Sequence, residues 1–188
     1  RLTRSTFFKM STLKQEDNFI AKFAKGDSTE MDEVAAIDYF VKHFEENKEP
    51  PESFNHNLID VFLRVLSDPS SRLRTNASFV AVRMICVPNE PAHAFVEKGT
   101  LDVFVKCIAT QDEPHEQLTV NCLAGVGAIA SHCDNCSKLA QATDVLEIIA
   151  DKMQSGAIDT QSLCSAAALC CITIACKGEA SMQLEASR

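Results

Sequence analysis

A phrase that the chain repeats is the feature that most constrains its fold. The eight residues from Ile59 to Leu66 match those from Leu101 to Ile108 in character at every position, and three of the eight are identical. The two copies are 42 residues apart, and a looser third copy begins at Thr143. Because periods in the low forties are typical of stacked helical units, the sequence predicts an array of helices.

Each copy is followed by a polar break and then by a second segment that is rich in small residues. When Ala77, Cys122 and Ala167 are aligned, these segments are spaced by 45 residues in both steps. In each segment, apolar residues occur four and seven positions after the aligned residue, and this spacing places them on one face of a helix. A shorter amphipathic piece precedes the second copy, where Pro91 suits a first helical turn and Gly99 a sharp corner. The predicted unit is therefore a short helix, an apolar helix and a small-residue helix.

Composition favours helices as well. Six Gly, six Pro and one Tyr in 188 residues leave little material for a strand-and-turn architecture. The stretches 117–133 and 160–176 each hold 17 residues without Asp, Glu, Lys or Arg. Each is just short of a membrane span and contains polar side chains, so we interpret both as buried core helices.

The repeats suggest boundaries along the chain. Residues 10–56 are expected to form N-terminal capping helices, and from Glu16 to Glu52 they carry eleven acidic residues against four Lys, interpreted as a solvated face. Residues 1–9 are interpreted as a tag or a joined peptide, and residues 177–188 as the start of a further, truncated repeat, as in a fragment of a longer protein. The repeats themselves are assigned to 57–86, 87–131 and 132–176.

The pattern of these repeats resembles that of the armadillo repeat family and of the related HEAT repeats. The resemblance rests on "FVEKGTLDVFVKCIAT" followed by "QLTVNCLAGVGAIAS", which read like the second and third helices of the family. It implies an all-α fold, a right-handed superhelical array or α-solenoid. It also implies that the third helices line a concave groove that holds an extended segment of a partner protein.

The resemblance carries candidate groove positions onto this chain. The family's groove Trp falls on Phe79, Ala124 and Leu169, and its groove Asn falls on Arg83, Ala128 and Thr173. Helical spacing extends the same faces to Arg72, Asn76, Gln117, Asn121, Ser162 and Ser165. The chain has no Trp, so the ladder with which related nuclear-import receptors hold basic peptides is missing, and recognition of nuclear signals is not expected.

Two features of these faces leave alternatives open. Arg72 and Arg83 would suit an acidic residue of a partner, with apolar anchors beyond, whereas Phe79 and Leu169 could equally be packed core residues. Gly125 and Gly127 lie inside a predicted helix, where each costs about 1 kcal/mol relative to Ala. We attribute them to the close approach of a neighbouring helix in preference to a ligand.

Other classes of function find little support in the sequence. A net charge of -8 argues against nucleic acids and anionic membranes as partners. The cluster from His132 to Cys136 resembles half of a zinc site, but no second ligand pair stands at a suitable spacing. No nucleophile elbow, phosphate loop or metalloprotease helix is present. We expect no enzyme activity, no cofactor and no bound metal.

The cysteines indicate a reducing compartment. Their number, nine, is odd, and most lie inside apolar helical segments. We therefore expect a cytoplasmic protein, with the nucleus as an alternative. The predicted function is a non-catalytic scaffold or adaptor that binds a partner protein segment along the groove. The alternatives are self-association through an end or the acidic N-terminal region, and a zinc or thiol protein that uses Cys133 and Cys136.

Overall fold

The computed structural model describes residues 22, 25, 29–47, 57–87, 90–110, 115–132 and 143–186. Within these residues all regular structure is helical, as the sequence predicted. The helices are α2 (Glu30–Glu46), α3 (Asn57–Ser67), α4 (Arg74–Cys86), α5 (Glu90–Glu97), α6 (Thr100–Ala109), α7 (Glu116–His132), α9 (Thr143–Gln154) and α10 (Gln161–Ala186). Across this described part of the chain, no helix combines the length and apolar character needed to cross a membrane.

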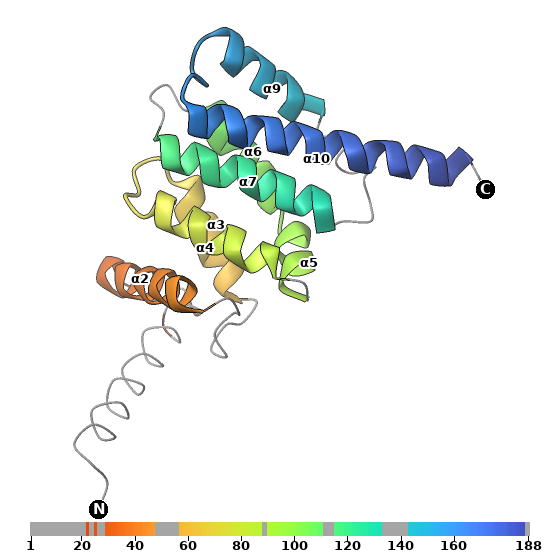
Figure 1. The fold of residues 1–188 in the computed structure, drawn as a ribbon. Helices are drawn as coiled ribbons and strands as arrows, with labels where there is room; N and C mark the ends of the chain where they lie inside the picture. The colour runs from red at the N-terminus through yellow and green to blue at the C-terminus, as the bar shows by residue number, and fades with distance from the viewer. Residues whose placement is uncertain are drawn as a thin grey trace, which may run out of the picture.

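Corresponding helices of the sequence repeats lie next to one another. The small-residue helices α4, α7 and α10 lie side by side, with α7 packed between the other two (Figure 1). The apolar helices form the other side of the molecule, where α3 packs on α4, α6 packs on α7, and α6 also contacts α3 and α9. The observed pairs thus follow the spacing of 42 to 45 residues that the sequence repeats.

The core lies between these two rows, on the faces that the repeats share. The aligned residues Ala77, Cys122 and Ala167 are each fully buried, which confirms that the small residues opening these segments point inward. The largest buried side chains are aromatic and come from four different helices, namely Phe40, Phe62, Phe95 and Phe104. Burying side chains of this size contributes about 1.5–3 kcal/mol each relative to exposure.

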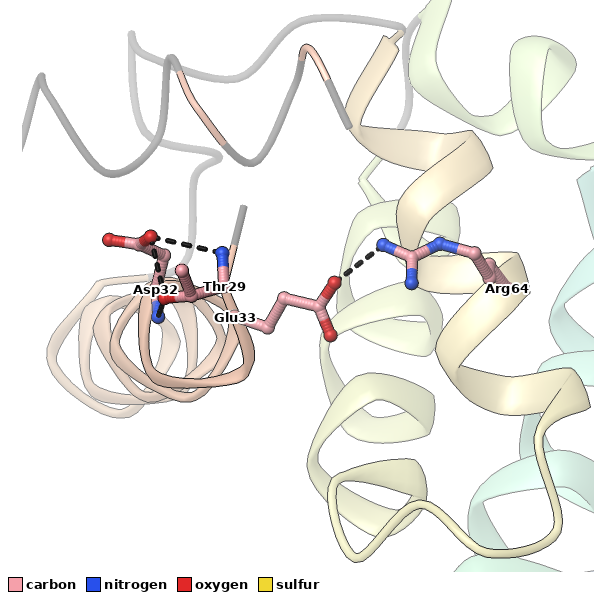
Figure 2. A network of polar contacts seen from close by, with 4 residues as sticks. All are labelled: Thr29, Asp32, Glu33 and Arg64. Carbon is pink, nitrogen blue, oxygen red and sulfur yellow. Dashed lines mark hydrogen bonds and ion pairs between the residues drawn. The ribbon is translucent and has the colours of Figure 1, made fainter. Parts of the chain in front are cut away.

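Helix α2 covers the first repeat, as expected of a capping helix. The ring of Phe40 packs edge-on against that of Phe62 of α3, with centroids 5.6 Å apart. Thr29 and Asp32 form a capping box, and the carboxylate of Glu33 reaches Arg64 of α3 with an N–O distance of 2.6 Å (Figure 2). The cap satisfies amide groups that the first helical turn would otherwise leave without partners.

Most of the predicted region 10–56 outside α2 lies outside the described residues, as do residues 1–9.

The second repeat has the predicted order of a short helix, an apolar helix and a small-residue helix. These are α5, α6 and α7. Gly99 has a φ of 80°, and it makes the corner between α5 and α6 that the sequence predicted. The short helix expected in the third repeat falls on residues 133–142, which lie outside the described residues.

The end of the third repeat differs from the prediction. Residues 177–188 were expected to start a further, truncated repeat, but α10 continues as one helix to Ala186 (Figure 1). The sequence "KGEASMQLEA" contains no proline and mostly good helix formers, and a single Gly178 costs only about 1 kcal/mol. The segment therefore extends the existing helix instead of starting a new one.

Candidate functional site

A groove lies over the small residues of α7, between α4 and α10. Its volume is about 540 Å³. Ala124, Gly127 and Ala128 form its floor on α7 because their short side chains leave the space between the two flanking helices unfilled. The helix backbones also come close at this point, since a β-carbon on Gly127 would lie 3.6 Å from Cα of Cys170. The groove is thus a direct result of the small-residue pattern in α7.

The groove is mainly apolar, with hydroxyl groups along its sides. Leu169 of α10 lines it and is 64% exposed. The hydroxyls of Thr173 and Ser131 donate to carbonyls of their own helices, those of Leu169 and Ala128, each at 2.8 Å. Two further hydroxyls, those of Ser162 and Ser165, belong to exposed residues on α10. Such a site offers apolar contact together with a few hydrogen-bonding groups.

Half of the predicted groove residues line this groove. They are Ala124, Ala128, Ser162, Ser165, Leu169 and Thr173. All six come from α7 and α10, so the predicted face is assembled at the C-terminal end of the array.

Asn121 was predicted as a groove residue, and the structure corrects this. It is buried, and its side-chain amide donates to the carbonyl of Thr75 at 3.2 Å and to the hydroxyl of Ser78 at 2.9 Å. Its carbonyl accepts from the exposed Gln117 at 2.9 Å. Helix α4 packs directly on this part of α7, so the side chain of Asn121 contacts α4 and does not face the groove. Gln117, which contacts Asn121, also lies outside the groove.

The predicted positions on α4 also lie outside the groove. Phe79 is half-buried and packs against the core, so the core alternative holds for this residue, whereas Leu169 is exposed. The guanidinium of Arg83 lies over the ring of Phe44 at 5.8 Å. Asn76 donates to the carboxylate of Asp38 at 3.5 Å. Helix α2 therefore occupies the end of the face that was expected to be open, and Arg72 is exposed in the turn before α4.

The prediction missed several residues of the groove wall. It extended each helix face only backward from the family positions, toward the N-terminus of the helix, and so left out the residues that follow them. The missed residues are Val82, Cys86, Val120, Leu123, Gly127, Ser131, Ala166 and Cys170. Val82 and Gly127 are 45 residues apart and each lies three residues after a predicted position, so the same repeat spacing could have found them.

The described residues give no sign of a metal centre. No group of three or more His, Cys, Asp or Glu side chains among them is arranged to hold an ion. The candidate pair Cys133 and Cys136 lies outside the described residues. His132 is the last residue of α7.

Comparison with known proteins leaves the chain without a family assignment. Its sequence matches no protein-family model and no curated protein.

Proposed function

We propose that this protein is a non-catalytic scaffold of armadillo-like repeats that binds a segment of a partner protein along the face formed by α4, α7 and α10. The proposal includes the right-handed superhelical arrangement of an α-solenoid. Its support is the repeat spacing in the sequence, together with the side-by-side packing of the three corresponding helices. We further propose that the protein acts in a reducing compartment, the cytoplasm or the nucleus, because Cys107, Cys122 and Cys170 are buried as free thiols.

The single observation that carries the proposal is the groove of about 540 Å³ over Ala124, Gly127 and Ala128. An apolar hollow of this kind, edged by hydroxyls, suits side chains from an extended or helical segment of another protein. Leu169 adds exposed apolar surface beside it. The exposed Arg72 and the half-buried Arg83 lie on α4 or just before it, beyond the groove, where an acidic residue of a longer partner segment would be attracted.

The proposal is tested by affinity capture with two matched variants. Leu169→Asp places a charge in the groove, and Met153→Asp places one on α9, where Met153 is 50% exposed and does not line the groove. Proteins captured by the wild type are identified by mass spectrometry, and the binding of the purified candidate is then measured. Loss of binding with Leu169→Asp and its retention with Met153→Asp is the expected result. Equal binding by both variants would remove the groove from the proposal.

A second candidate function is self-association through α10. Ile172 is 58% exposed and lies on the same helix as the exposed Leu169, so two copies could bury this apolar surface against each other. Sedimentation velocity over a range of concentrations distinguishes the two functions. A monomer at all concentrations rules out self-association and leaves the partner proposal intact.

A further inference from the structure

A second, smaller pocket lies on the opposite row of helices and contains a cysteine. Its volume is about 380 Å³, and it is formed where the end of α3 and the start of α4 meet α6. The charged residues in its wall are Arg74, Asp102 and Lys106, and Cys107 lies beside them. Cys107 is only 2% exposed, so the pocket is the route by which a small molecule would meet its sulfur.

The guanidinium of Arg74 holds the sulfur of Cys107. Nη2 of Arg74 lies 3.1 Å from this sulfur, and Nε of the same side chain donates to the carbonyl of Leu66 at 2.9 Å. The second hydrogen bond fixes the guanidinium while the first favours a negative charge on sulfur. The neutral thiol of Cys107 would donate to the same carbonyl at 3.6 Å, a weaker contact that the thiolate gives up.

A second thiol, that of Cys122, lies on α7, which packs against α6. Its interaction with Cys107, together with Arg74 and against the effect of burial, lowers the pKa of Cys107 to about 6. The same interaction and complete burial raise the pKa of Cys122. The pair therefore consists of one sulfur that is readily ionised and one that stays protonated next to it.

The pKa values of three other thiols are shifted in the opposite direction. Burial raises the pKa of Cys170 to about 12, and partial burial of the sulfur also raises the pKa values of Cys86 and Cys171. Cys170 lines the apolar groove, away from Arg74. It is thus a natural control for burial without activation.

We propose that Cys107 and Cys122 form a peroxide-responsive pair, in which Cys107 reacts with a hydroperoxide in the pocket and Cys122 converts the product into a disulfide between α6 and α7. This function is independent of partner binding in the groove. The order of the two residues follows from their surroundings. Cys107 lines the pocket beside Arg74, whereas Cys122 is fully buried and does not line the pocket.

The thiolate of Cys107 attacks one oxygen of the hydroperoxide, the O–O bond breaks, and the leaving oxygen takes up a proton as an alcohol or water. Cys107 is now a sulfenic acid. The sulfur of Cys122 attacks that sulfur, its proton goes to the departing hydroxide, and water leaves. Overall, two thiols are oxidised to one disulfide while the hydroperoxide is reduced.

The proposal is tested with the full chain and hydrogen peroxide. Cleavage after Glu116, which lies between the two cysteines in the sequence, separates Cys107 from Cys122 unless a disulfide joins them. We expect the joined peptides to appear on mass spectrometry before other thiols are oxidised. In Cys122→Ser, dimedone should instead trap a sulfenic acid on Cys107. The control Cys170→Ser should behave as the wild type does.

Three outcomes would overturn the proposal. They are no modification of Cys107, oxidation of the exposed Cys86 or Cys176 ahead of it, or sulfenic acid on wild-type Cys107 without a disulfide. Because Cys107→Ser could disturb the packing, the decisive data come from the wild type, with circular dichroism to show that each variant is folded.

The role of Arg74 is tested through the pH dependence of Cys107 alkylation by iodoacetamide. The charged and titratable groups near the sulfur are Arg74 from α4, Asp102 and Lys106 from α6, and Cys122 from α7. Arg74→Met should move the midpoint of the rate profile to higher pH, and Arg74→Lys should restore it in part. An unchanged midpoint in Arg74→Met would show that the guanidinium does not activate the thiol.

Discussion

The ring of Phe104 on α6 packs against the backbone of Gly125 on α7. A β-carbon on Gly125 would lie 2.8 Å from Cδ2 of this ring and closer still to Cε2, whereas real β-carbons stay farther from their neighbours. Phe104 is fully buried and has little room to move. Gly125 lowers the helix propensity of α7, but its missing side chain allows the two rows of helices to pack closely at this contact.

This contact predicts different effects for alanine at two neighbouring glycines. Gly125→Ala gains about 1 kcal/mol of helix propensity, but overpacking against Phe104 costs about 1–3 kcal/mol. We expect a net loss of stability. Gly127→Ala meets only an ordinary contact at 3.6 Å, so its stability should be unchanged or higher by up to about 1 kcal/mol. Urea unfolding of both variants checks this, and an equal or greater stability of Gly125→Ala would contradict it.

The buried amide of Asn121 should matter more than the exposed amide that it contacts. Asn121→Ala removes hydrogen bonds to α4 from a buried site, and we expect a loss of about 1–3 kcal/mol. Gln117→Ala removes a bond made from an exposed side chain and should change stability by no more than about 0.5 kcal/mol. Chemical denaturation measures both. Similar losses of stability for the two variants would contradict the larger role of the buried amide.

The capping box predicts how α2 responds to acid. Hydrogen bonds from Thr29, first from its backbone amide and then from its hydroxyl, lower the pKa of Asp32. Because the folded pKa lies below the unfolded one, the stabilisation is present above the unfolded pKa and is lost as pH falls through the folded pKa. Thr29→Ala keeps the amide and removes the hydroxyl, so the pKa of Asp32 should rise partway to its ordinary value. Carboxyl NMR titration would detect this, and an unchanged pKa would contradict it.

The ion pair between Glu33 and Arg64 should contribute little despite its short distance. The side chain of Arg64 is 56% exposed, so solvent screens the interaction, and we expect a coupling energy of no more than about 1 kcal/mol. A double-mutant cycle with Glu33→Gln and Arg64→Met measures it. The cycle is needed because Glu33 makes a further interaction that a single variant would also remove. A clearly larger coupling would mean that the pair anchors α2 on α3.

The repeat spacing predicted the helices and their neighbours because it reflects the demands of packing. Ala77, Cys122 and Ala167 were aligned from the sequence, and all three are buried. The end of the third repeat was not predicted correctly, because no residue between Cys176 and Ala186 forces a helix to stop. The repeat pattern predicts where similar helices occur, whereas the position at which each helix ends depends on its local residues.

Only half of the predicted residues line the candidate groove, for a related reason. The groove residues were predicted by transferring the same positions from one repeat to the next, which is valid only if every repeat has the same exposed face. Helix α2 breaks that assumption at Arg83 and Asn76, which contact Phe44 and Asp38. Toward α10 the face is open, and there Ala128 and Leu169 line the groove as predicted. Contacts between a capping helix and the first repeat are long-range, and no periodic pattern records them.

Photo-crosslinking from inside the groove tests the central proposal most directly. A photoreactive amino acid is placed at Ala124, which is exposed and lines the groove, and separately at Leu146, which is 39% exposed on α9 and does not line it. Each protein is irradiated with the partner that affinity capture identifies. We expect crosslinks to one partner segment from position 124 and none from position 146. Crosslinks from position 146 without any from position 124 would contradict it.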